Sequence, residues 1–227
     1  MLQCSIHGDQ KGNVLDSDFN SGEEVASLKE MLVEHTMIHG CVIRKLWPAD
    51  LSAFRDHLLR LDAQSRFDRF AMAVNDDFLI RYAQRCFGVH DVTYGYYVEG
   101  TLRGAGELRA VSSNIIGGSV EAAFSVEQEW RRRGVGTELM SRIVRAARNR
   151  RADALYMSCL ASNAAMQALA KKFSADLRFE TDDMTGKLVA REPSAASVWR
   201  EFADNATSFA TAMLDLQTRV YSMQRRV

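Results

Sequence analysis

Long hydrophobic runs, an excess of charge of either sign and an export-type leader are all missing from this sequence. No window approaches the roughly 20 continuous apolar residues that a membrane-spanning helix requires, so we expect no membrane partner. The first residues lack a basic segment followed by an apolar run, so we predict a cytoplasmic location. Lys and Arg together number 29, as do Asp and Glu, so the net charge does not attract nucleic acid over a distance. Any anion-binding site must therefore be local.

Cysteine and proline are also scarce. The sequence has four cysteines, which are Cys4, Cys41, Cys86 and Cys159. They form no CxxC pair and no Cys/His cluster at metal-ligand spacing, so we predict neither a disulfide framework nor a metal site. The two prolines are Pro48 and Pro193, and the second is a candidate boundary.

The length and the apolar content suffice for one large folded domain. The chain has 227 residues, of which 47% are hydrophobic, and this is enough for a substantial core. Residues 1–28 are polar and show no sustained period, so we predict an N-terminal arm there. We place the folded domain at residues 29–192 and a C-terminal helix at residues 193–227.

Hydrophobic periodicity predicts the order of strands and helices. A strand at residues 41–45 precedes helical segments, and a block of three strands follows, in which Glu99-Gly100 turns a hairpin. Then come a helix, a buried strand at residues 154–160, a helix that begins at Asn163, and two strands joined by a turn containing Asp182, Asp183 and Gly186. This order predicts an α+β fold with a mixed, mostly antiparallel twisted sheet flanked by helices, rather than a doubly wound parallel sheet.

The most informative window runs from Phe124 to Leu139, where a strand and a bend lead into Arg131-Arg132-Arg133-Gly134-Val135-Gly136 and a helix. The open N–H groups and the dipole at a helix N-terminus favour an anion, and glycine lets a phosphate approach the backbone. The loop therefore predicts a pyrophosphate site, and a tight turn with a solvated rim is the alternative. It is neither a dinucleotide GxGxxG motif nor a Walker loop, because no Gly-Lys-Ser/Thr follows.

This loop resembles the [Gln/Arg]-x-x-Gly-x-[Gly/Ala] signature of the GNAT superfamily of N-acetyltransferases. The segment Phe124-Ser125-Val126 precedes it where the family has its central strand, and Asn163 matches a later Asn of the family. The resemblance implies an N-acetyltransferase that uses acetyl-CoA as co-substrate. It implies that the cofactor is bound by Phe124, Ser125, Val126, Arg131, Arg132, Arg133, Gly134, Val135, Gly136, Thr137 and Asn163. Asn163 can equally be a simple helix N-cap.

Acetyl transfer to an amine requires a base, because a protonated amine has no lone pair with which to attack the thioester. The strand that Glu121 opens resembles the corresponding strand of bacterial protein-lysine acetyltransferases, where a glutamate at this place is the base. We therefore assign Glu121 as the general base, and an ordinary exposed strand-end residue is the alternative. Glu107, on the preceding strand, is the reserve candidate, because two paired carboxylates would raise the pKa of one of them. Many family members have a tyrosine acid where this sequence has Ala170, so we assign no acid.

The early helical segment Ser65–Phe70 also resembles those lysine acetyltransferases, in which the early helices border the acceptor pocket. A core helix with solvated charges is the alternative reading. His57 and His90 have no partner that can be recognised in the sequence, so no nucleophilic triad is predicted.

Beyond Pro193 an apolar stripe follows alternating spacings of four and three residues, which is the pattern of a helix that packs on another helix. The stripe consists of Phe202, Ala206, Phe209, Met213, Leu216, Val220 and Met223. It predicts either a homodimer through the C-terminal helix or packing on the domain's own surface.

Several functions remain open at this point. The acceptor is a primary amine, either a protein lysine or a small molecule, and a non-catalytic acyl-CoA-binding sensor is a further alternative. Nucleic-acid binding is the weakest reading. It rests on the local positive charge between Arg131 and Arg151. Three of these arginines, Arg142, Arg145 and Arg148, lie opposite the apolar face of their helix, and an ordinary solvated face is the alternative.

Overall fold

The computed structural model describes residues 41–88, 91–111, 118–174, 176–180, 183–189 and 193–224. The arm predicted for residues 1–28 lies outside the described residues, as do the beginning of the predicted 29–192 domain, His90 and Asp182.

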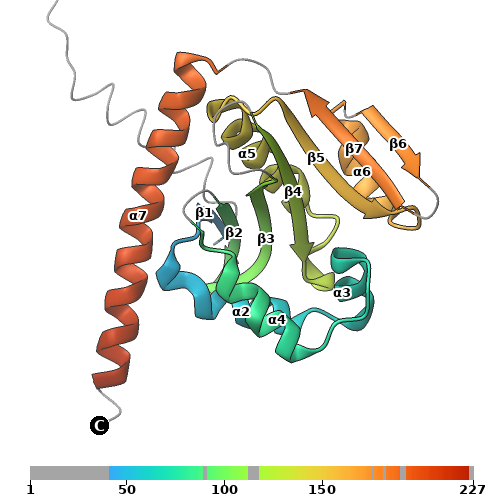
Figure 1. Cartoon of the computed structure of the whole chain (residues 1–227). Helices are drawn as coiled ribbons and strands as arrows, with labels where there is room; N and C mark the ends of the chain where they lie inside the picture. Colours follow the sequence, from blue (N-terminus) through green and yellow to red (C-terminus); the bar gives the residue numbers. More distant parts are fainter. Residues whose placement is uncertain are drawn as a thin grey trace, which may run out of the picture. The chain divides into compact units, whose positions relative to one another are not determined.

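In the described part of the chain, seven strands form one sheet in the order β1-β2-β3-β4-β5-β7-β6 (Figure 1). Every neighbouring pair is antiparallel except β4 and β5, which are parallel. The predicted α+β fold with a mixed, mostly antiparallel sheet is therefore confirmed. The strands are β1 (Cys41–Lys45), β2 (Val92–Val98), β3 (Thr101–Ala110), β4 (Ser119–Val126), β5 (Ala154–Leu160), β6 (Asp176–Glu180) and β7 (Asp183–Val189).

Helices pack on both faces of the sheet. Side chains alternate between the two faces along each strand, so apolar residues on either face can pack against a helix. On β3, Ala105 belongs to a buried cluster with residues of α2 and α4. Leu108, an odd number of positions further on, belongs to a second cluster with residues of α5. No described helix is both long and apolar enough to cross a membrane. The helices are α2 (Leu51–Arg60), α3 (Ala63–Phe70), α4 (Asp76–Arg85), α5 (Val135–Asn149), α6 (Ala164–Lys172) and α7 (Ala195–Gln224), with 3-10 turns at Pro48–Asp50 and Gln128–Trp130.

The hairpin predicted at Glu99-Gly100 is confirmed by the pairing of β2 with β3. Both turn residues have positive φ, 49° for Glu99 and 74° for Gly100. Two residues in the left-handed region are what a tight two-residue hairpin needs to match the twist of its strands.

The last two strands differ from the prediction, which placed Asp183 and Gly186 in a turn because these residue types favour turns. Instead β7 begins at Asp183, and Gly186 pairs with Met157 of β5 on one side and Leu177 of β6 on the other. Strand partners on both sides outweigh the local turn preference.

α7 lies against α5 and β1 through polar contacts. The carboxylate of Asp204 pairs with Arg142 at 3.3 Å and with Arg145 at 2.8 Å. The hydroxyl of Ser208 accepts a hydrogen bond from the backbone N–H of Lys45 in β1 at 3.2 Å. The side chain of Arg142 is only 8% exposed. The prediction that this arginine face is exposed is therefore wrong for Arg142 and Arg145, because an acidic residue of α7 covers them.

Candidate active site

β4 and β5 separate after a short paired stretch. Ser119–Glu121 of β4 pairs with Ala154–Tyr156 of β5, but β4 continues to Val126 and β5 to Leu160 without further pairing. On its other edge β4 stays paired with β3 up to Val126. The backbone groups of residues 122–126 that face β5 therefore have no strand partner there, and an extended molecule can lie between the two strands.

α5 begins directly after this open part of β4, and its N-terminus suits an anion. Gly134 is the N-cap with φ 82°, and no side chain caps the first turn. A Cβ added at Gly134 would meet no atom within 4 Å, so the glycine is needed for its left-handed backbone and leaves the first N–H groups approachable. Arg132, Arg133 and Gly134 are exposed. The predicted loop thus combines approachable donors with positive charge, and its residues fit a diphosphate.

Arg131 differs from the other two arginines because its guanidinium already donates hydrogen bonds to protein groups, whereas that of Arg133 lies over the Trp130 ring at 4.8 Å. Its Nη2 donates to the hydroxyl of Ser65 at 2.6 Å, and its Nε donates to the carbonyl of Val126 at 3.1 Å. Ser65 lies in the first turn of α3, where Asp62 caps the helix by accepting from the Ser65 N–H. Arg131 therefore joins the loop to both β4 and α3.

Asn163 is the N-cap of α6, which is the alternative to its predicted contact with the cofactor. Its side-chain oxygen accepts from the N–H of Met166 at 3.0 Å. At the other end of α6, Lys172 Nζ lies 3.4 Å from the hydroxyl of Thr137, in the first turn of α5. α6 is thus adjacent to the loop, and contact of Asn163 with a cofactor stays a prediction.

Glu121 lies where β4 and β5 part, in register with Arg109 of β3 and Tyr156 of β5. Its side chain is half-buried. Among the described residues no hydrogen-bond donor or cation pairs with its carboxylate, because the guanidinium of Arg109 binds Glu107 instead. A carboxylate without such partners can accept a proton from a molecule in the opening.

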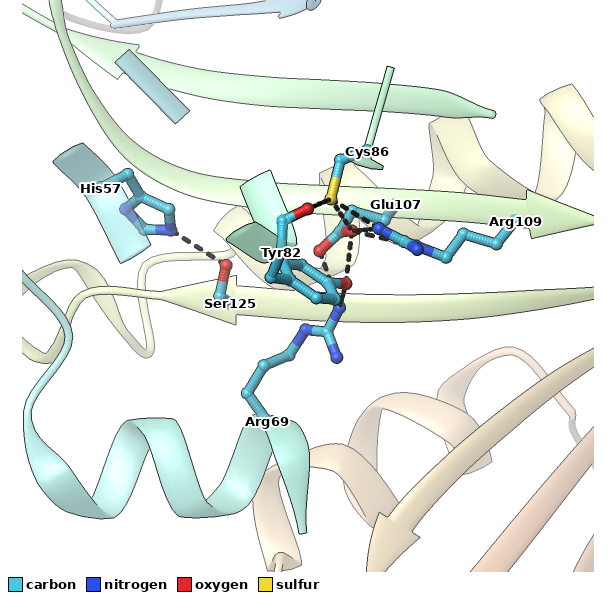
Figure 2. A network of polar contacts seen from close by, with 7 residues as sticks. All are labelled: His57, Arg69, Tyr82, Cys86, Glu107, Arg109 and Ser125. Carbon is cyan, nitrogen blue, oxygen red and sulfur yellow. Dashed lines mark hydrogen bonds and ion pairs between the residues drawn. The ribbon is translucent and has the colours of Figure 1, made fainter. Parts of the chain in front are cut away.

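Glu107 is surrounded by donors from α3, α4 and β3 (Figure 2). Its side chain is 1% exposed. One carboxylate oxygen lies 2.7 Å from Arg69 Nη2, and the other accepts from the Tyr82 hydroxyl at 2.8 Å and from Arg109 Nη2 at 3.1 Å. The thiol of Cys86 lies 3.6 Å from that second oxygen. We call these residues the Glu107 cluster.

Glu107 does not have the raised pKa that pairing with a second carboxylate could give it. Burial alone would raise the pKa, but the charges of Arg69 and Arg109 and the hydrogen bonds from Arg69 and Tyr82 outweigh it and hold the pKa below its ordinary value. The partners of Glu107 are thus cations and not Glu121, which lies diagonally across the strand pair. Its lone pairs are occupied, so its geometry favours a positioning role over that of a base.

His57 has buried partners that the sequence did not reveal. Its Nδ1 lies 3.1 Å from Glu127. Its Nε2 lies 2.9 Å from the Ser125 hydroxyl, as Figure 2 shows. Burial lowers the pKa of His57 despite the opposing effect of Glu127. Although burial opposes it, hydrogen bonds from His57 and Arg103 lower the pKa of Glu127 to about 2. An ionised carboxylate can only accept, so Nδ1 donates to it and Nε2 accepts from Ser125.

This contact ties α2 to the part of β4 that β5 leaves unpaired. Glu127 also accepts from Arg60 of α2 at 2.9 Å and from Arg103 of β3 at 2.8 Å. Period-two alternation along β4 places Ser125 on the same face as Glu121. The resemblance assigned Ser125 to the cofactor, but its hydroxyl binds His57. Nothing local to His57 in the sequence indicates that it lies opposite Ser125.

One hollow adjoins α3, in the region that the sequence assigned to the acceptor, and a second is lined by α4 and the segment that leads to it from α3. Both include Ala73 and Val74, and one also includes Arg66 and Phe67 of α3. The Phe67 side chain is 42% exposed. α3 contacts both β4 and β5, so an exposed aromatic residue is carried by the helix next to the opening.

Comparison with known proteins agrees with this geometry. Residues 56–174 match the model of the acetyltransferase (GNAT) family. No curated protein matches the chain.

Similar solved structures include three acetyltransferase folds. The GNAT domain of S. lividans PAT has a TM-score of 0.57 and 17% identity, over 66% of this chain and 90% of that one. The GNAT-family acetyltransferase from Streptococcus pneumoniae has a TM-score of 0.55 and 13% identity, over 66% and 99%. YncA from Salmonella typhimurium, solved with its cofactor acetyl-CoA, has a TM-score of 0.52 and 16% identity, over 69% and 98%. At these identities the likeness concerns the fold.

Proposed function

Because this chain belongs to the acetyltransferase (GNAT) family and is therefore an acetyltransferase, we propose that it moves the acetyl group of acetyl-CoA to the primary amine of a protein lysine, with Glu121 as the general base. One observation carries the proposal. A half-buried carboxylate, which pairs with no cation in the part of the chain that the structure describes, lies where β4 and β5 part. The open edge of β4 leads to a helix N-terminus that no side chain caps.

The open edge of β4 and the loop offer complementary contacts to the two ends of the cofactor. Backbone groups of Phe124 and Val126 would bind the extended pantetheine arm, and N–H groups between Arg131 and Thr137 would bind the diphosphate. Arg132 and Arg133 would add charge-assisted hydrogen bonds to phosphate. The guanidinium of Arg131 already binds Ser65 and Val126, so we assign its side chain to shaping the loop.

Glu121 would take the proton that the attacking nitrogen must lose. The bound cofactor supplies an activated thioester, so a C–N bond forms while the C–S bond breaks. Ala170, at the place of the family's tyrosine, is 2% exposed and carries no acid. A thiolate is a stable leaving group, so water is sufficient as its proton donor.

A lysine suits the opening because its amine stands at the end of a long unbranched chain. Such a side chain can reach the point where β4 and β5 part while the rest of the peptide stays on the surface. The exposed Phe67 on α3 and the neighbouring hollow would contact the flanking residues of that peptide. The resemblance of the Glu121 strand to lysine acetyltransferases favours the same acceptor.

The test compares Glu121→Gln with the wild type on acetyl-CoA and a panel of lysine peptides, aminoglycosides and small amines. We expect lysine peptides to be acetylated at Nε, with turnover lowered about 10²–10⁴-fold in Glu121→Gln, as for loss of a general base. Calorimetric affinity for coenzyme A should stay within a few-fold of the wild type, because the loop is unchanged.

Glu99→Gln is the matched control, since Glu99 is exposed at the tip of the hairpin and its substitution should leave turnover unaltered. Acetylation of small amines alone would contradict the lysine proposal. Full turnover in Glu121→Gln would show that another group is the base.

A further inference from the structure

The amphipathic pattern of α7 is inverted with respect to the domain that it packs on. Helices on a folded domain usually bury their apolar face and expose their polar one. Among residues 195–209 of α7, where the structure describes the burial of side chains, the buried ones are polar, with Glu201 at 8% and Ser208 at 4% exposure. Large apolar side chains of the same helix are exposed.

The polar face of α7 has specific partners on the domain. Glu201 binds Arg150 at 3.0 Å and accepts from Asn149 at 2.5 Å. One turn later Asp204 binds Arg142 and Arg145. After another turn, the hydroxyl of Ser208 accepts a hydrogen bond from the backbone of β1. These contacts fix which face of the helix points away from the domain.

The outward face of α7 carries large apolar side chains. Trp199 is 71% exposed, Phe202 64%, Phe209 53% and Val198 50%. The rings of Trp199 and Phe202 stack on each other at 5.8 Å. Phe209 lies at the margin of this face, where its ring contacts Trp47 of the domain edge-on at 6.0 Å and stays half-exposed. Scattered exposed apolar residues need no explanation, but a row of three aromatic rings on one helix marks an interaction surface.

We propose that this outward face of α7 pairs with the same face of a second copy of the chain, so that the protein is a homodimer joined by two α7 helices. The spacing of the apolar stripe specifies a helical partner. From Phe202 to Met223 it alternates between four and three residues, and this repeat keeps one seam against another helix. α7 has 30 residues, about 45 Å at a rise of 1.5 Å per residue.

A second copy is the occupant that the sequence of α7 favours. Two identical surfaces pair around a twofold axis, so each copy supplies the helix that the other needs. Like charges beside the seam would oppose self-pairing. The flanking positions are instead mostly small or neutral, namely Ala203, Asn205, Ala210, Ala212 and Gln217.

Sedimentation velocity and light scattering on the full chain test the proposal. The wild type should be a dimer at micromolar concentrations. Phe202→Glu should raise the dimer dissociation constant about 100-fold or more, because each dimer then buries two carboxylates in its seam. Arg200→Glu, an exposed position of the same helix off the stripe, is the matched control and should remain dimeric.

A cysteine cross-link checks the helix pairing without relying on dissociation. Met213 is the middle residue of the stripe, so it meets its own counterpart in a parallel and in an antiparallel pair alike. Met213→Cys should form a disulfide-linked dimer under mild oxidation, whereas the wild type and Arg200→Cys should not. A wild type that is monomeric at about 100 μM would overturn the proposal, because a dimer with a micromolar dissociation constant would be almost fully associated at that concentration. So would a Phe202→Glu variant that stays as dimeric as the wild type. Acetyltransferase turnover is measured separately from the oligomeric state. Neither a dimeric nor a monomeric result therefore decides the outcome of the Glu121→Gln test.

Discussion

Replacing Glu107 by Gln should separate a structural carboxylate from a catalytic one. The substitution keeps the size of the side chain but removes the charge that faces Arg69 and Arg109. Both arginine side chains are more than two-thirds buried, Arg69 being 11% and Arg109 28% exposed. Gln can still accept from one donor, but its NH₂ group then meets another donor.

Magnitudes for buried ion pairs set the expected size of this effect. Removing one partner of such a pair costs about 3–5 kcal/mol, because it leaves an uncompensated charge. We expect the low end, about 3 kcal/mol at pH 7, since one hydrogen bond survives in the Gln variant. For a chain of this length that corresponds to a fall in Tm of roughly 6–12 °C. Urea denaturation and a thermal scan measure both quantities.

The pH dependence gives the sign of the electrostatic contribution. The folded state lowers the pKa of Glu107, so its stabilisation is complete above the unfolded-state value of about 4.3 and is lost as pH falls through the folded value. The difference in free energy of unfolding between the wild type and Glu107→Gln should therefore become smaller only at acidic pH. Glu121 forms no ion pair with any described residue, so Glu121→Gln should lose turnover with little change in Tm. A Glu107→Gln variant within about 1 kcal/mol of the wild type at pH 7 would refute this account of the cluster.

Two more substitutions test the loop and the buried histidine. Gly134→Val should cost about 1–2 kcal/mol and raise KM for acetyl-CoA, because a β-branched residue disfavours φ 82° although space is open there; an unchanged KM would contradict the assignment of the loop. Burial lowers the pKa of His57 in the folded state. The free energy of unfolding of the wild type should therefore fall as pH drops below about 6.5, the pKa of a histidine in the unfolded chain. In His57→Gln this pH dependence should be weaker, and thermal scans between pH 8 and 5.5 would measure it. If Tm fell equally steeply with pH in both proteins, groups other than His57 would be the cause.

The parts of the site that come from one continuous segment could be predicted from the sequence. The strand, the bend and the helix N-terminus around Gly134 follow each other within a few residues, so local preferences determine them. The hairpin at Glu99-Gly100 is local in the same sense. The tertiary structure overrode local preference at Gly186, where strand neighbours on both sides keep a turn-type residue extended.

The parts that connect distant segments could not be predicted. Arg69 and Glu107 are 38 positions apart, and His57 and Ser125 are 68 apart. Periodicity indicates the face on which a residue lies but not the side chain that it meets. For α7 the stripe revealed an apolar face, yet Asp204 gave no sign in the sequence that it would pair with Arg142 and Arg145.

α3 connects the two halves of the candidate site, because it is held at both ends by long-range contacts. Near its start Ser65 accepts from Arg131 of the diphosphate loop, and near its end Arg69 binds Glu107 on the sheet. α3 has only eight residues, so a shift at either end moves the whole helix and the exposed Phe67 with it. Loss of the Glu107 charge should therefore disturb the loop through α3 and Arg131, which predicts a raised KM for acetyl-CoA in Glu107→Gln. Glu121→Gln leaves α3 anchored, so its KM should not change, and equal KM values in the two variants would show that α3 does not couple the sheet to the loop.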